Sequence, residues 1–183
     1  MEEYAWVVDF LPDGRANDRL REPIAQLVGE RNFTLFEASI KQGAVVRFED
    51  RLYVGKDQRE HVEKIRRVEF DELTAAARNE LNAIIKRIVL HREKEFVEFF
   101  NKCGSISIRL HQLDLLPGIG KKHLEEILEK REAKPFESFK DMQEGVQLLP
   151  DPVNLLVMRI AEELRGASKH YLFVRLPMQR QQF

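Results

Sequence analysis

The chain has 183 residues, 43% of them hydrophobic, which allows one sizeable core or two small ones and excludes a large multidomain enzyme. Lys and Arg number 30 against 31 Asp and Glu, so the net charge is -1 and any phosphate-binding site has to be local. The single cysteine, Cys103, excludes an intrachain disulfide and the thiolate clusters of zinc ribbons and iron–sulfur centres, which favours a cytoplasmic protein. We expect no membrane contact, because the N-terminus is unlike a signal peptide and no apolar run approaches about 20 residues.

The first third of the chain alternates between large apolar and polar residues, as β-strands do. Residues 4–10 place Tyr4, Trp6, Val8 and Phe10 on one side of a first strand, and a turn follows at residues 12–14. Further strands are expected at residues 32–40, 45–49, 51–55 and, less clearly marked, 61–70. The pattern favours a small antiparallel β-barrel, OB-like, over residues 1–70. Residues 15–31 mix charges of both signs and are expected to form an exposed loop.

From Asp71 the apolar residues recur at three and four positions, which predicts an amphipathic helix. Asp71 or Thr74 can cap its start. A second helix is expected over residues 92–102, ended by Gly104 in the left-handed conformation. These connecting helices occupy residues 71–104.

Residues 105–167 are expected to be helical. With Ser107 as a cap, a short helix is predicted at residues 109–115, a turn at 117–120 and a helix at 121–131. Ser138 with Asp141 resembles a capping box, and Asp151 followed by Pro152 predicts the start of a helix that ends at Gly166. The tripeptide Leu-Leu-Pro at residues 115–117 and 148–150 suggests a duplicated hairpin whose second copy lacks the glycines.

In the last segment, residues 168–183, a strand over residues 171–176 is expected to return to an edge of the barrel. The tail at residues 179–183 is expected to be mobile. The whole is therefore predicted as an α+β fold: the small antiparallel barrel, the helical module and the returning C-terminal β-strand.

The glycine turn carries the strongest chemical signal. Gly118 and Gly120 let the backbone approach a ligand, so amides near Gly118, Gly120 and Lys121 can converge on a phosphate oxygen at the start of the next helix. Ile119 is expected to anchor the turn. Lys121 and Lys122 oppose the helix dipole in the first turn, a conflict that a bound anion removes. The alternative is a tight connection between helices with two solvated lysines.

Weaker signals each have two interpretations. Arg109 and His111 either extend the phosphate contact or are solvated and packing residues, with equal weight. The aromatic residues of the first third either stack bases or fill the barrel, and core packing is favoured: Trp6, Phe33, Phe36, Phe48 and Tyr53. The histidines lack metal-site spacing, so we expect no metal and no cofactor.

Residues 107–131 resemble the helix-hairpin-helix family of DNA- and RNA-binding proteins, whose hairpins hold phosphates through backbone amides. The match to a tandem second hairpin is weaker, because Pro150, Asp151 and Pro152 replace the Gly-x-Gly. The whole chain is also similar to an archaeal family of uncharacterised proteins with an ascribed RNA-binding role and an N-terminal β-barrel. This second resemblance rests on the hairpin and on residues 4–13, 70–74 with 80–81, 96–101, 109–111, 135–136 and 171–173.

The predicted function is non-enzymatic binding of nucleic acid, and the resemblance alone favours RNA over DNA. Two alternatives are weighed. One is a protein–protein adaptor in which the hairpin is scaffold, and the near-neutral net charge keeps protein partners open. The other is a base-excision glycosylase with Lys122 and Asp141 as candidates, which the missing surroundings of that family disfavour.

Overall fold

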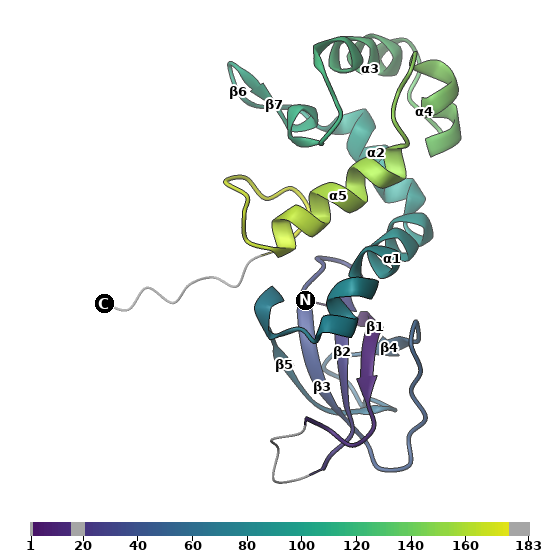
Figure 1. The fold of residues 1–183 in the computed structure, drawn as a ribbon. Coiled ribbons are helices and arrows are strands. Elements are labelled where there is room, and N and C mark those ends of the chain that lie inside the picture. Colours follow the sequence, from purple (N-terminus) through teal and green to yellow (C-terminus); the bar gives the residue numbers. More distant parts are fainter. Residues whose placement is uncertain (1, 16–20, 176–183) are drawn as a thin grey trace. The chain divides into compact units, whose positions relative to one another are not determined.

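The computed structural model describes residues 2–15 and 21–175. The chain divides into two compact units: residues 1–84 with 163–183 form unit 1, and residues 85–162 form unit 2 (Figure 1). The expected mobile tail at 179–183 lies outside the described residues. Of the helices that the structure describes, none is both long enough and apolar enough to cross a bilayer.

Unit 1 contains one five-stranded antiparallel sheet in the order β4-β1-β2-β3-β5. Its strands are β1 (Tyr4–Leu11), β2 (Ile24–Gly29), β3 (Leu35–Ile40), β4 (Arg51–Tyr53) and β5 (Val62–Arg67). An antiparallel sheet joined to helices is thus confirmed. Instead of a closed barrel, the described strands form a curled half-barrel with β4 and β5 as its edges (Figure 1).

The core of unit 1 lies in the curl of the sheet. Its small and branched residues include Ala25 and Leu27 of β2 and Ala38 of β3, all 0% exposed. Trp6 and Val8 project to the opposite side of β1 and are also buried. A register shift between Val7 and Asp9 turns Phe10 toward the core, so the expectation that Phe10 shares a side with Trp6 is wrong.

The loop expected at residues 15–31 is wrong for residues 24–29, which form strand β2, while residues 16–20 lie outside the described residues. The charged residues next to the strand are Arg21, Glu22, Glu30 and Arg31, while residues 24–29 are apolar except for the buried Gln26. The flanking charges concealed a short central strand. The strand expected at 45–49 is also wrong, because that segment is part of the connection from β3 to β4.

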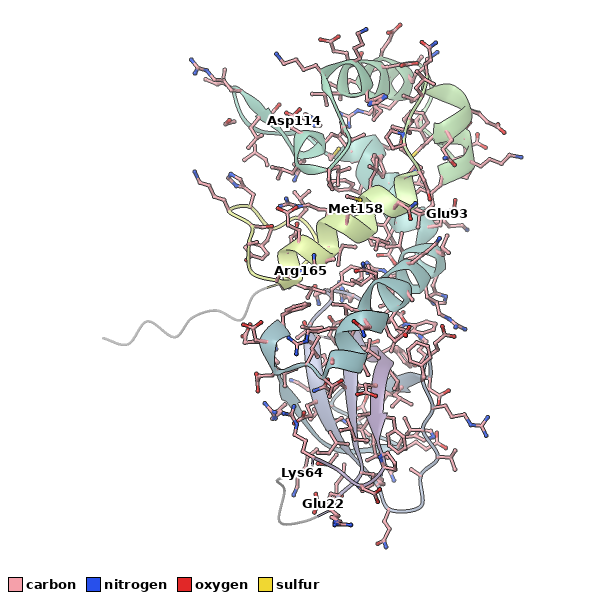
Figure 2. The ribbon with its side chains drawn as sticks, viewed as in Figure 1. Glu22, Lys64, Glu93, Asp114, Met158 and Arg165 are labelled. Atoms are coloured by element: carbon pink, nitrogen blue, oxygen red, sulfur yellow. The ribbon has the colours of Figure 1, made fainter. Side chains whose placement is uncertain are left out.

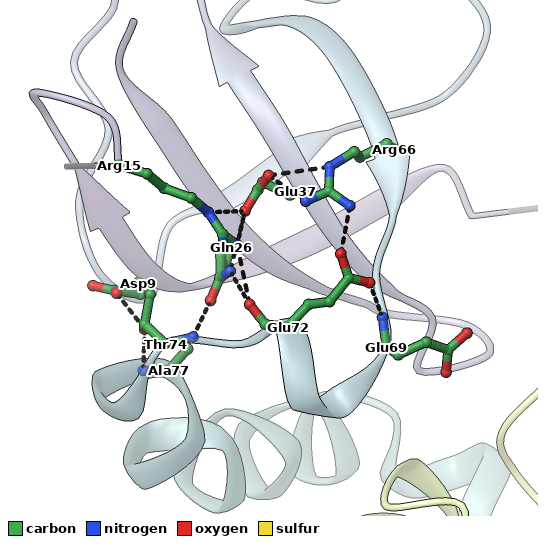
Figure 3. Close-up of polar contacts among 9 residues, drawn as sticks. All are labelled: Asp9, Arg15, Gln26, Glu37, Arg66, Glu69, Glu72, Thr74 and Ala77. Atoms are coloured by element: carbon green, nitrogen blue, oxygen red, sulfur yellow. Dashed lines mark hydrogen bonds and ion pairs between the residues drawn. The ribbon is translucent and has the colours of Figure 1, made fainter. Parts of the chain in front are cut away.

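The helix α1 (Ala75–His91) begins in unit 1 at a polar anchor on the sheet (Figure 3). The hydroxyl of Thr74 accepts a hydrogen bond from the amide of Ala77 at 2.9 Å, which confirms Thr74 as a cap. That hydroxyl also donates to Asp9 at 2.6 Å, and the Thr74 amide donates to Gln26 Oε1 at 2.8 Å. The cap residue therefore fixes the first turn of α1 to β1 and β2.

Glu37 is the centre of the same network (Figure 3). It pairs with Arg15 and with Arg66, and Gln26 Nε2 donates to it at 3.2 Å. Burial acts to raise the pKa of Glu37, but the hydrogen bonds from Arg15, Arg66 and Gln26 outweigh it and hold the pKa below its ordinary value. Glu72, in the 3₁₀ turn η1 (Phe70–Glu72), accepts from Arg66 at 2.8 Å and links η1 to the sheet.

Residues 171–175, the last that the structure describes, belong to unit 1 and form no strand. The fully buried carboxylate of Glu163 accepts hydrogen bonds from the amides of Leu172, Phe173 and Val174, at 2.8, 3.0 and 2.9 Å. Arg175 N donates to Asn32 O at 3.3 Å. The strand expected at 171–176 is wrong for residues 171–175, because one carboxylate takes the amides that a sheet edge would need.

Unit 2 is mainly helical. After the last turns of α1 come α2 (Glu93–Lys102), α3 (Lys121–Ala133), α4 (Phe139–Gly145) and α5 (Pro152–Leu164), whose last two residues belong to unit 1. Two interpretations of the sequence are wrong here. Gly104 is not left-handed, and residues 109–115 are not an α-helix but part of a hairpin of β6 (Ser105–Ser107) and β7 (Leu110–His111), followed by the 3₁₀ helix η2 (Gln112–Leu115). The Ser-Ile-Ser-Ile alternation has the two-residue period of a strand, although the residues of β6 are all exposed.

Candidate functional site

The η2–α3 hairpin turns at residues 116–119. Ile119 N donates to Leu116 O at 3.1 Å, with Pro117 second and Gly118 third in the turn. Gly118 has φ of 101°. Proline second and glycine third are the residue preferences of a type II turn. The positive φ favours glycine here, and a Cβ on Gly118 would lie 3.1 Å from Leu155 Cδ2 of α5, which would have to shift slightly.

The base of the η2–α3 hairpin is fixed by His111 and Asp114 (Figure 2 labels Asp114). Nδ1 of His111 accepts from Leu113 N at 3.1 Å, and Asp114 Oδ2 accepts from His111 N at 2.7 Å. Burial, and then the charge of Arg131, lower the pKa of His111, which favours the neutral ring that accepts this bond. His111 is 8% exposed and serves as the cap of η2, so it does not lie on an exposed phosphate-binding surface.

The crest of the η2–α3 hairpin is the start of α3. Gly118, Gly120, Lys121 and Lys122 are exposed, and Ile119 is half-buried. Gly120 is the N-cap, with φ of −95°, and it provides no side-chain cap; the first turn contains no acidic residue. Open space surrounds the position of a Cβ on Gly120. The sequence thus brings two backbone-exposing glycines and two lysines together at one helix start.

The first intrahelical bond of α3 leaves several amides at this crest free. Leu124 N donates to Gly120 O at 3.0 Å, which is the first i to i−4 hydrogen bond of the helix. The amides before Leu124 therefore have no acceptor within the helix. In the described part of the chain, the amides of Gly120, Lys121 and Lys122 have no hydrogen-bond partner. An anion at this point can accept from these amides and meet the positive end of the helix dipole.

A second hairpin, between α4 and α5, repeats the turn with other residues. Leu149 N donates to Val146 O at 3.4 Å, and Leu148 has φ of 54° at the position that corresponds to Gly118. Val146 and Leu116 are each 1% exposed and each end a helix. The structural repeat therefore aligns residues 146–149 with 116–119. Aligning the two Leu-Leu-Pro tripeptides, at residues 115–117 and 148–150, would shift this alignment by three residues.

The helix start that follows this second hairpin is closed. Asp151 Oδ1 accepts a hydrogen bond from Val153 N at 3.0 Å, so a carboxylate of the chain itself occupies the anion position of α5. The same type of turn is thus present twice in unit 2. Before α5 it leads to a helix start capped by the carboxylate of Asp151, and before α3 it leads to a helix start capped only by Gly120.

Charge is segregated along the stretch that contains the crest. Residues 99–124 include four Lys or Arg residues and a single carboxylate, Asp114, in a chain whose net charge is -1. The four cations are all exposed, and the first of them pairs with Glu98, just before this stretch: Lys102, Arg109, Lys121 and Lys122. Asp114 accepts from the His111 amide and belongs to the base of the hairpin. The net charge of -1 conceals this local excess of positive charge, which can be read from the sequence.

Arg109 lies apart from the crest, in the turn of the β6–β7 hairpin, and is exposed. Its neighbour Ile108 has a relative exposure of 105%. The structure therefore places Arg109 on a second loop of unit 2 and not on the first helix of the η2–α3 hairpin.

The remaining candidates have structural roles. In unit 1, Trp6, Phe33 and Phe36 are buried, which confirms core packing for these three, while Phe48 is 44% exposed and Tyr53 is half-buried. Asp141 lies in the first turn of α4, which Ser138 caps, and its Oδ2 accepts from Glu137 N at 2.9 Å. The described residues contain no cluster of three or more His, Cys, Asp or Glu side chains placed to hold a metal ion.

The two units define a class of protein in which an antiparallel half-barrel is joined to a helical unit with an open glycine hairpin. The chain belongs to the family described as "Protein of unknown function (DUF655)", whose model matches residues 1–175. It is 42% identical over 177 residues to the uncharacterized protein MJ0038 of Methanocaldococcus jannaschii, covering 95% of this chain and 80% of that protein. It is also similar to the crystal structure of Af1531 from Archaeoglobus fulgidus, described as belonging to the same family, with a TM-score of 0.88, 46% identity, and coverage of 95% of this chain and all of that one (100%).

Proposed function

We propose that this protein binds nucleic acid without enzymatic activity, and that the η2–α3 hairpin is a helix-hairpin-helix that holds backbone phosphates. The open start of α3 carries the proposal: the amides of Gly120, Lys121 and Lys122 are unpaired and exposed. Two lysines flank them, in a first turn where cations oppose the helix dipole. A phosphate would pair the amides, balance the lysines and complement the dipole at once.

The closed hairpin supports this interpretation. If the glycine turn were only a connection, an Asp at the start of α3 would give a better helix cap, as Asp151 does for α5. At α3 the chain has Gly120 instead, and no acid follows until Glu125. The position is therefore less favourable for helix stability alone and more favourable for an external anion.

RNA is the proposed polymer, with DNA second. The preference comes from the resemblance to an archaeal family with an ascribed RNA-binding role. A hairpin that contacts phosphates gives affinity without reading sequence, so both polymers share the same chemistry at this site.

Fluorescence anisotropy of labelled single-stranded RNA, hairpin RNA and duplex DNA across a potassium chloride series tests the proposal. We expect affinity to fall with salt at a log–log slope of about −2 to −4, because a few contacted phosphates release about that many counterions. The double variant Lys121→Gln with Lys122→Gln should lower the steepness of this slope by about 1.5. The matched control is Lys134→Gln with Lys140→Gln, two exposed lysines of unit 2 that pair with Glu137 and Glu144 and should leave the slope unchanged.

Absence of binding to all three polymers at low salt would overturn the proposal and favour the adaptor, in which the glycine turn is architecture. Release of bases or strands from damaged duplexes would favour the glycosylase instead. We expect no release, since Asp141, its candidate carboxylate, accepts from the Glu137 amide at the start of α4.

A further inference from the structure

The tip of the β6–β7 hairpin exposes an apolar side chain without a local structural reason. Ile108 and Arg109 form the two-residue turn between Ser107 and Leu110. At 105%, Ile108 has the highest relative exposure among the exposed large hydrophobic residues that the structure describes. Tight hairpin turns favour Gly, Asn or Asp in left-handed conformations, and neither turn residue has a positive φ. Neither the turn geometry nor the solvent favours isoleucine at this position.

The hairpin is firmly attached to the η2–α3 hairpin. Gly104 N donates to Gln112 Oε1 at 2.9 Å, and Gln112 N donates to Gly104 O at 3.0 Å. Ser105 pairs with His111, which caps η2. The root of the β6–β7 hairpin and the base of the η2–α3 hairpin thus share the same residues, so the tip is held in a fixed frame relative to the crest.

The charge around the tip identifies the kind of partner. Arg109 is exposed beside Ile108, and the only carboxylate in residues 99–124, Asp114, accepts from the His111 amide. An apolar tip within a cationic stretch complements a polymer whose outside is anionic and whose interior is apolar. Nucleic acid has this character, because its charged phosphates enclose stacked base faces.

We propose that the β6–β7 hairpin is a wedge: Ile108 inserts against an unstacked nucleobase of the strand whose phosphates the η2–α3 hairpin holds. Arg109 contacts an adjacent phosphate. The proposal rests on the proposed function and adds the feature of the polymer that is recognised. Apolar side chains inserted at base steps are a known means of binding and kinking nucleic acid. Unpaired loops and bulges are then preferred to a continuous duplex, because their bases are the least costly to unstack.

The test uses the full chain and an RNA hairpin with 2-aminopurine in its loop, whose emission rises when the base is unstacked. We expect wild-type protein to raise the emission on binding. Ile108→Ala should abolish the rise, weaken binding to the loop RNA about tenfold and leave the salt slope unchanged. Arg109→Gln should instead reduce the steepness of the salt slope by about 1 and keep the rise at saturation.

Leu148→Ala is the matched control, because Leu148 is also an exposed apolar turn residue of unit 2, at 87%. Its emission change and affinity should equal those of the wild type. If Ile108→Ala also behaves as wild type while the polymer still binds with a steep salt slope, the wedge is wrong and the phosphate site stands. If no polymer binds the wild-type protein at low salt, the phosphate proposal fails and the wedge fails with it.

Discussion

Replacing Gly120 with aspartate separates the two interpretations of the glycine turn. In Gly120→Asp the new carboxylate would take the place that Asp151 has at α5, where it accepts from Val153 N at 3.0 Å. Gly120 has φ of −95° in the extended region and open space around its Cβ position, so aspartate fits without strain. A better cap and a favourable charge near the helix dipole should raise the free energy of unfolding by about 0.5–1 kcal/mol.

Binding should change in the opposite direction. The aspartate carboxylate would occupy the free amides and repel phosphate, so we expect affinity for RNA at low salt to fall at least about tenfold, with a salt slope less steep by about 1. Urea unfolding and fluorescence anisotropy measure the two effects on the same preparations. Gly120→Asn is the control, since it caps the helix without a charge and should weaken binding less than the aspartate.

A more stable Gly120→Asp variant that binds RNA as tightly as wild type would refute the reasoning, because the α3 amides could not then be the phosphate site. A variant that loses both stability and binding would show instead that the open-space geometry at Gly120 does not hold.

Further predictions concern the turns and two titrating groups. Gly118→Ala should lower the free energy of unfolding by about 1–3 kcal/mol, since alanine would have a left-handed φ and press on Leu155. Leu148→Gly should raise the free energy of unfolding by about 0.5–1 kcal/mol, because Leu148 has a positive φ at the equivalent turn position. Urea unfolding compares the two variants. The lowered pKa of His111 gives stability that is fully present above 6.5 and is lost as pH falls through the lower folded pKa, so thermal unfolding should show a mid-pH decline that is absent in His111→Asn. The lowered pKa of Glu37 gives stability that is present above pH 4.5 and is lost as pH falls through the folded pKa. A Glu37→Gln variant whose stability fell at acid pH as steeply as that of the wild type, in unfolding measured across a pH series, would contradict this.

Much of the helical unit could be predicted from the sequence because a few adjacent residues determine where a helix begins and ends. Ser138 accepts from Asp141 N and Asp151 caps α5, as their spacing predicts. The turn before α3 follows from Pro117 and Gly118, whose backbone preferences hold in any context. The strong candidate site was therefore visible in residues 116–122 alone.

The β6–β7 hairpin and its exposed Ile108 were not predicted, although the alternation in Ser-Ile-Ser-Ile was present in the sequence. The segment is too short for either a strand or a helix pattern to be decisive. His111 illustrates the same limit: its residue type suits a phosphate contact, yet in the structure it is a buried cap.

By itself the sequence determined the features that depend on a few adjacent residues: the capped helices, the glycine turn and the lysines beside it. The tertiary structure alone decided which backbone groups remain open. Gln26 in β2 can be buried because its side chain accepts from the Thr74 amide and donates to the Glu72 carbonyl in η1. Residues 172–174 form no strand because their amides donate to the Glu163 carboxylate. Such choices depend on partners far along the chain, since every buried polar group must find a hydrogen bond wherever the fold offers one.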